Sequence, residues 1–351
     1  MKNIYTYILL FAAAIGLAAG CAKEVTSGPN EANKRFIKAW MHVYNQTKGT
    51  DIEPSGLGVY ILDETPGDGA EVTENGYAIV EYIKTDLEGN ISDYTDALTA
   101  KQLGTYTRAN YYGPKVWLTK DGTIQAGLQD ALVGMKAGGR KKVVVPSWLM
   151  TYSTYGSAAE YLKHSSDYSN TIYDVTVKFF TDSIDVWQQD SIERYIIKEY
   201  GDIEAFSNDT TGFYFKRDGS LPADAKEFSK DTSIYINYTG KLLNGLVFDT
   251  TSERIAKEQG IFDPSRTYEP VKIQWGETAG GITMGSSSSS VISGFSRTLW
   301  KMRYVPDSQY RDKCTGIFTS SFGYGYSGSG SSIPGYAPLI FEIEVVDKPE
   351  D

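Results

Sequence analysis

The amino-acid sequence contains one internal repeat, and this repeat limits the folds that the chain can adopt. Matching segments recur at an offset of about 155–160 residues, which is the size of a domain and far longer than a solenoid period. A helix-like stretch opens each copy, residues 36–44 in the first and residues 192–200 in the second. The sequence therefore predicts two tandem domains of similar fold.

Strand-like segments follow the helix-like stretch in each copy. These strand-like segments are residues 76–82 and 233–240. In the second, Ile234, Ile236 and Tyr238 recur with the period of two that a half-buried strand shows. Tyr82 and Tyr238 stand at corresponding ends of these two strands. In the second copy the pair Asn244–Gly245 then marks a tight hairpin turn.

Each copy continues with a short helix-like segment that is preceded by glycine, and it closes with a strand. The helical spacing of apolar residues is found in residues 127–135 and 294–302. The closing strands are residues 172–180 and 339–347. Several strands with one short helix packed across them make an α+β fold, and we expect this fold in both domains.

Composition excludes several classes of function. The net charge of the 351 residues is −10 and there is no basic run, which disfavours nucleic acid as a partner. Only two cysteines (Cys21 and Cys314) and two histidines (His42 and His164) are present, so a disulfide framework, a metal site and a histidine-based triad are not expected. Twenty-six tyrosines favour aromatic-lined β structure and apolar pockets.

The first 21 residues indicate the compartment. Lys2 is followed by an uncharged, mostly apolar run at residues 7–20, which is too short to span a membrane comfortably and has the character of a secretory signal. The run ends in LAAGC and resembles the bacterial lipoprotein signal. The resemblance implies that Cys21 carries lipid and anchors the chain in the cell envelope, on either face of the outer membrane. An ordinary signal with a coincidental cysteine is the alternative.

Four segments of the second copy resemble, in order, the FKBP-type peptidyl-prolyl isomerases. They are INYTG…NGLVFDTT (236–251), VISGF (291–295), SFGYG (321–325) and IPGYAPLIFEIEVVD (333–347). The resemblance implies a curved antiparallel sheet around one short helix, with an aromatic pocket between the two. It also implies proline-containing polypeptides as partners and no cofactor or metal.

Carried over residue by residue, the resemblance assigns the pocket. Phe248, Phe295 and Phe341 are expected to hold the proline ring, Tyr324 to donate its hydroxyl to a substrate carbonyl, and Asp249 to orient Tyr238. The residues expected to complete the binding surface are Val271, Val291, Ile292 and Ile333.

The first copy keeps the scaffold and has a poorer pocket. The pair Ser92–Asp93 replaces the Phe-Asp pair, Gln125 brings a polar side chain, and Leu128 takes the floor, while Tyr173 stands for the wall aromatic of the last strand. Polar groups weaken both ring binding and water exclusion. We therefore expect an inactive binding or structural domain.

These observations predict the following ranges: 1–21 for a lipoprotein signal peptide, 22–50 for a polar tether and N-terminal helix, 51–181 for the first FKBP-like domain, 182–210 for a connecting helix and 211–351 for the second FKBP-like domain. The expected function is prolyl isomerisation that assists the folding of envelope or exported proteins. A non-catalytic peptide-binding chaperone is the alternative, and a glycan-capture lipoprotein is a third hypothesis. The sequence leaves the client proteins, the residue preferred before proline and the oligomeric state open.

Overall fold

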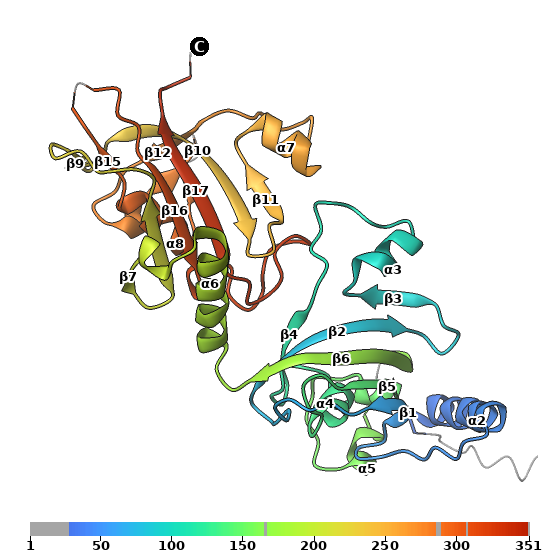
Figure 1. Ribbon diagram of the computed structural model, residues 1–351. Coiled ribbons are helices and arrows are strands. Elements are labelled where there is room, and N and C mark those ends of the chain that lie inside the picture. Colours follow the sequence, from blue (N-terminus) through green and yellow to red (C-terminus); the bar gives the residue numbers. More distant parts are fainter. Residues whose placement is uncertain (1–27, 165–166, 286–288, 307, 350–351) are drawn as a thin grey trace, which may run out of the picture.

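The computed structural model describes residues 28–164, 167–285, 289–306 and 308–349. It contains two large antiparallel sheets, each with helices packed against it, so the fold is α+β (Figure 1). We call residues 28–181 the first half and residues 182–349 the second half. The predicted signal peptide and Cys21 lie outside the described residues.

The first half carries a six-stranded sheet with the order β1-β5-β6-β2-β3, and β4 also pairs with β2. The strands are β1 (Tyr60–Thr65), β2 (Tyr77–Thr85), β3 (Ile91–Tyr94), β4 (Lys115–Leu118), β5 (Arg140–Val145) and β6 (Thr171–Thr181). The helices are α2 (Glu31–Lys48), α3 (Ala97–Gln102), α4 (Ala126–Leu132) and α5 (Ala158–Tyr161).

The second half repeats this topology in a nine-stranded sheet. Its order is β14-β13-β12-β10-β17-β16-β8-β7, with β11 also paired to β10. The strands are β7 (Ser207–Thr210), β8 (Phe213–Arg217), β10 (Ser233–Leu242), β11 (Val247–Thr250), β12 (Val271–Gln274), β13 (Thr283–Met284), β14 (Ser289–Ser290), β16 (Lys313–Phe318) and β17 (Leu339–Val346). The helices are α6 (Ile184–Tyr200), α7 (Glu253–Gln259) and α8 (Ser293–Trp300). The series β1-β5-β6-β2 therefore corresponds to β8-β16-β17-β10.

Two helices cover opposite faces of the second sheet. Along β17, Leu339 and Phe341 belong to the cluster that contains the α8 residues Phe295 and Leu299. The intervening Ile340 packs instead with Ile192 and Ile196 of α6. Because successive side chains of a strand point to opposite faces, α8 and α6 lie on opposite sides of the sheet. Helix α2 takes the place of α6 in the first half, where Ile37 and Met41 are buried in its core.

A matched polar contact fixes each of these long helices. Gln188 of α6 is fully buried, and its amide donates to Ser320 Oγ at 3.0 Å and accepts from the Ser320 backbone at 2.6 Å. In the first half Asn33 of α2 donates to Ser147 Oγ at 3.0 Å. Ser320 begins the turn that leads to Tyr324, so α6 also supports the loop that carries a predicted site residue.

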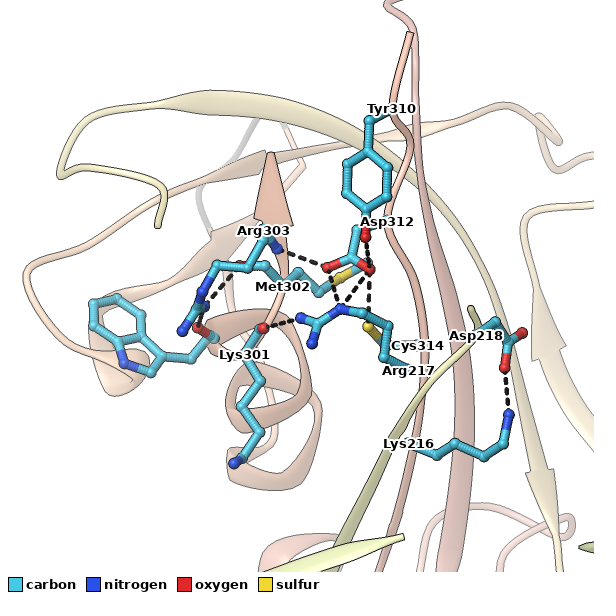
Figure 2. Close-up of polar contacts among 10 residues, drawn as sticks. Lys216, Arg217, Asp218, Lys301, Met302, Arg303, Tyr310, Asp312 and Cys314 are labelled. Atoms are coloured by element: carbon cyan, nitrogen blue, oxygen red, sulfur yellow. Dashed lines mark hydrogen bonds and ion pairs between the residues drawn. The ribbon is translucent and has the colours of Figure 1, made fainter. Parts of the chain in front are cut away.

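The link between α8 and β16 is held by a buried carboxylate. Asp312 is 1% exposed and accepts from Arg217 Nε at 2.9 and 3.1 Å, from the Arg303 backbone at 2.7 Å and from the Tyr310 hydroxyl at 3.0 Å (Figure 2). Cys314 Sγ lies 3.6 Å from the same carboxylate. Burial, and then the Asp312 charge, raise the pKa of the Cys314 thiol well above its ordinary value. The network ties this long link to β8.

The predicted elements are confirmed in their type and order. The two short helices appear as α4 and α8, and the closing strands as β6 and β17. The helix-like openings of the two copies belong to α2 and α6, which extend further than the predicted stretches. Within the described ranges, no helix combines the length and the apolar character that crossing a bilayer requires.

Candidate functional site

The second half contains a cavity of about 500 Å³ between the sheet and α8. Its walls come from β10, β11 and β17, from the start of α8 and from the loop before β17. Of the ten predicted site residues, nine line it: Tyr238, Phe248, Asp249, Val291, Ile292, Phe295, Tyr324, Ile333 and Phe341. The cavity also has walls from Arg266, Met284, Ser290, Ser329 and Ser332.

Four aromatic rings converge on this cavity. Phe295 lies edge-on to Phe341 with a centroid separation of 5.0 Å, and Phe248 lies edge-on to Phe341 at 5.6 Å. Tyr238 packs edge-on against Phe295 at 5.4 Å. Edge-to-face packing at these distances stabilises aromatic clusters, and it leaves ring faces directed toward one shared space.

Gly240 of β10 permits this convergence. A Cβ atom at this position would lie 2.5 Å from the Phe248 ring and 3.0 Å from the Phe341 ring. Gly240 pairs with Phe341 on one side and with Asp249 on the other. The missing side chain therefore makes room for two of the three phenylalanine rings.

A polar chain borders the apolar wall. The Tyr238 hydroxyl donates to Asp249 Oδ2 at 2.6 Å, and Arg266 forms an ion pair with Asp249 Oδ1. Burial, followed by the Asp249 charge, raises the pKa of Tyr238 above its ordinary value, so its hydroxyl stays protonated at neutral pH. Since this proton is committed to Asp249, Tyr238 is a poor donor to a bound ligand.

Tyr324 stands at the mouth of the cavity and is 38% exposed. Its hydroxyl has no hydrogen-bond partner among the residues that the structure describes. The loop that carries it is fixed to α8, because Ser293 Oγ donates to the Phe322 carbonyl at 3.2 Å. Tyr324 therefore has a hydroxyl that is available to a ligand.

Val271 is the predicted residue that does not line the cavity. It pairs with Ile236 at the start of β12, is half-buried and packs against the core cluster of the second half. Its short side chain does not line the shared space.

Arg266 was not predicted. It follows α7, a helix that separates the Phe248–Asp249 pair from β12 by more than twenty residues of chain. The sequence could have indicated Arg266 as a cation that stands between the Phe248–Asp249 pair and the next strand. Helix α7 lies between them and makes the distance along the chain too long for this pattern to be recognised.

The first half also has a hydrogen-bonded tyrosine–aspartate pair with a cation beside it, and a tryptophan ring packs against the tyrosine. The Tyr82 hydroxyl donates to Asp93 Oδ2 at 2.6 Å, and Lys115 Nζ lies 3.0 Å from that hydroxyl. The Trp117 ring packs 4.9 Å from Tyr82 and 6.2 Å from Tyr173. Neither Lys115 nor Trp117 was predicted.

The other predicted features of the first half lie as follows. Ser92 is exposed, Leu128 is buried, and Gln125 donates to the Tyr152 hydroxyl at 3.0 Å. A hollow of about 430 Å³ in this half is lined by residues that include Ile124, Gln129 and Tyr161, and not by Tyr82, Asp93 or Tyr173. It is thus a different place from the aromatic cavity of the second half.

Sequence comparison with known proteins agrees with this geometry. Residues 224–346 match the model of the FKBP-type peptidyl-prolyl cis-trans isomerase family. We call these residues the FKBP-type segment. It contains every residue that lines the aromatic cavity, and the first half lies outside it.

Curated relatives match part of the chain at low identity. A probable FKBP-type peptidyl-prolyl cis-trans isomerase of Haemophilus influenzae is 29% identical over 137 residues, which are 39% of this chain and 43% of that protein. FK506-binding protein 1A of Aspergillus fumigatus is 28% identical over 126 residues, 36% of this chain and 86% of that protein. The match thus spans less than half the length of the Haemophilus relative.

Among solved structures, the three FKBP domains of wheat FKBP73 align with 86% of this chain and 100% of that chain, at 15% identity and a TM-score of 0.27.

Within the described ranges, no group of three or more His, Cys, Asp or Glu side chains is arranged to hold a metal ion.

Proposed function

We propose that the second half is a peptidyl-prolyl cis-trans isomerase that acts on extended or unfolded proline-containing chains. The observation that carries this proposal is the cavity in the FKBP-type segment, in which Phe248, Phe295 and Phe341 face one another beside Tyr238 and Asp249. The cavity has room for a five-membered ring.

Differential binding of the twisted bond accounts for catalysis. Rotation about an X–Pro bond crosses a barrier of about 18–20 kcal/mol, because resonance between nitrogen and carbonyl is lost. The planar ground state is the more polar one, so an apolar cavity disfavours it relative to the rotated state. The three phenylalanines hold the ring and exclude water, while the Tyr324 hydroxyl donates to a carbonyl of the chain.

Asp249 and Arg266 have a supporting role in this mechanism. Asp249 accepts from Tyr238 and pairs with Arg266, and these contacts hold the carboxylate in place beside the carbonyl carbon of the rotating bond. The charge acts electrostatically, and no proton is transferred in the rotation. No covalent intermediate is therefore needed.

The test is the rate of cis-trans isomerisation of a short proline peptide in the presence of the full chain. We expect acceleration above the uncatalysed rate, and a loss of about ten- to a hundredfold in kcat/KM for Phe248→Ala and Asp249→Ala, which is about 1.4–2.7 kcal/mol of transition-state stabilisation. If the wild type gives no acceleration and still binds the peptide, the non-catalytic chaperone replaces the enzyme.

We also propose that the chain is a lipid-anchored protein of the cell envelope, with the domain ranges given above, which assists folding of envelope or exported proteins. The proposal is supported by LAAGC at residues 17–21. Mass spectrometry of the protein from a bacterial host should find the acyl chains on Cys21. Cys21→Ser should release the protein from the membrane fraction, and retention of that variant would contradict the anchor.

A further inference from the structure

The loop before β17 borders the cavity and also touches the first half. We call residues 326–336 the rim loop. Ser329, Ser332 and Ile333 of this loop line the cavity. The loop is closed by two backbone hydrogen bonds, from Ser329 N to the Ile333 carbonyl at 2.8 Å and from Ile333 N to the Ser329 carbonyl at 3.1 Å.

A segment of the first half binds the outer side of the rim loop. Residues 107–114, between α3 and β4, form this docking segment, which lies beside the loop in Figure 1. The Tyr111 backbone N–H donates to the Ser331 carbonyl at 2.8 Å, and the Ser331 hydroxyl donates to Asn110 Oδ1 at 2.6 Å. These bonds join positions that are more than two hundred residues apart in sequence.

The Tyr111 ring is part of the second half's core. It packs against the cluster that contains Ile333 and Phe341, although it belongs to the chain of the first half. Its hydroxyl donates to the Pro114 carbonyl at 2.9 Å, which holds the ring in place. Burial raises the pKa of Tyr111 to about 12, in agreement with a ring removed from water.

A second contact lies at the other end of the rim loop. Tyr77 of β2 packs edge-on against Tyr336 with a centroid separation of 5.5 Å. Tyr336 has a φ of +62°, in the left-handed region that residues other than glycine seldom adopt. Its backbone donates to the Gly325 carbonyl at 2.8 Å, directly after Tyr324. The contact with Tyr77 therefore supports a strained turn beside the cavity mouth.

The composition of the rim loop explains why it needs this support. It reads YSGSGSSIPGY, and a run of glycine and serine has few apolar side chains with which to order itself. We propose that the first half is a positioning device, in which the docking segment holds the rim loop in the conformation that places Ile333 in the cavity wall. The second half then binds proline-containing chains more tightly, because less ordering remains to be done on binding. The link to affinity rests on the proposed function.

The experiment compares Tyr111→Ala with Tyr44→Ala in the full chain. Tyr44 is a half-buried tyrosine of α2 that stacks on Trp40 at 5.3 Å and lies outside the docking segment, so its removal is a matched control. Hydrogen exchange of the Ser329 and Ile333 amides should be about tenfold faster in Tyr111→Ala than in the control, since local opening sets this rate. KM for a short proline peptide should rise about three- to tenfold, with kcat little changed.

A second variant keeps the test decisive if Tyr111→Ala does not fold. Ser331 is exposed, so Ser331→Ala should fold, and it should accelerate exchange at Ile333 by about threefold. Equal exchange in the variants and the Tyr44→Ala control would overturn the inference. Faster exchange with unchanged KM would overturn the link to affinity.

If the proposed isomerase function is wrong, the experiment gives a result that differs from failure of the docking inference. A wild type that does not accelerate isomerisation removes the enzyme, while the exchange rates still decide whether the docking segment orders the rim loop. In that case affinity is measured as the Kd of the same peptide.

Discussion

The two halves hold the same polar chain and differ in what lies beside it. Tyr82 and Asp93 in the first half correspond to Tyr238 and Asp249 in the second, and both Tyr–Asp hydrogen bonds measure 2.6 Å. Each pair has a cation beside it, Lys115 of β4 in the first half and Arg266 of the link before β12 in the second. The tyrosine–aspartate pair is therefore not sufficient to form the aromatic cavity. The neighbouring aromatic wall decides whether a cavity exists.

Strand pairing identifies the residue that fills the first site. Trp117 of β4 pairs with Ala78, as Ile273 of β12 pairs with Ile234, and Tyr82 and Tyr238 lie four residues further along. Ile273 is fully buried, whereas the larger Trp117 ring reaches both Tyr82 and Tyr173. The larger side chain at this shared position thus packs against the two residues of the first half that correspond to Tyr238 and Phe341.

The largest expected effect concerns the two carboxylate–arginine pairs. Asp312→Ala leaves Arg217 without its carboxylate in a buried site and should lower the free energy of unfolding by about 3–5 kcal/mol. Asp174→Ala removes one of the two carboxylate partners of Arg140 in the first half, where the side chains are partly exposed and Asp63 remains, and should cost about 1 kcal/mol or less. Urea denaturation measures both, and equal losses would contradict the difference in burial.

The second prediction concerns a variant in which the aromatic cavity of the second half is given the serine that the first half has at the same position. Phe248→Ser copies Ser92, removes one wall of the cavity and should lower kcat/KM for a proline peptide about a hundredfold. Ser92→Ala in the first half is the control and should leave the rate unchanged. A Phe248→Ser variant with wild-type kcat/KM would show that the aromatic wall is not what binds the ring.

The third prediction concerns the filled site. Trp117→Ile copies Ile273 and should destabilise the first half by about 1–2 kcal/mol, because a large half-buried ring is replaced by a smaller side chain. Thermal unfolding measures the loss. Added isomerase activity is not expected, since Ser92 still provides no wall, and a gain in kcat/KM would show that Trp117 alone blocks the first site.

The smallest predicted effect appears at alkaline pH. Burial raises the pKa of Tyr82, Tyr173 and Tyr238 above the ordinary value of 10.0. Above pH 10 the unfolded chain loses these protons while the folded protein keeps them, so stability is full below pH 10 and falls as the pH rises. Tyr173→Phe should reduce this fall by about 1 kcal/mol per pH unit, measured by urea denaturation at pH 9 to 11. An identical slope would contradict the raised pKa of Tyr173.

Periodicity and the repeat were sufficient to predict the scaffold. The alternation in residues 233–240 and the helical spacing in residues 294–302 are local patterns, and β10 and α8 follow them. The aromatic wall was predictable because Phe248, Phe295 and Phe341 stand in short motifs at these elements.

What the sequence did not reveal depends on contacts between distant segments. Arg266 reaches Asp249 across the inserted helix α7, and Trp117 lies in a short strand that had no recognised counterpart in the repeat. Tyr111 packs into the core of the other half, which no local pattern encodes. The contacts of Arg266, Trp117 and Tyr111 depend on strand register and on packing between the halves.

The most direct test compares matched wall residues in the two halves. Phe341 and Tyr173 occupy corresponding closing strands, and each ring contacts the tyrosine of its own polar chain. Isomerisation of one proline peptide would be measured by exchange NMR with the full-length wild type, Phe341→Ala and Tyr173→Ala. We predict that Tyr173→Ala retains the wild-type rate and that Phe341→Ala loses about a hundredfold in kcat/KM. A fully active Phe341→Ala, or a loss confined to Tyr173→Ala, would contradict the assignment of the site to the second half.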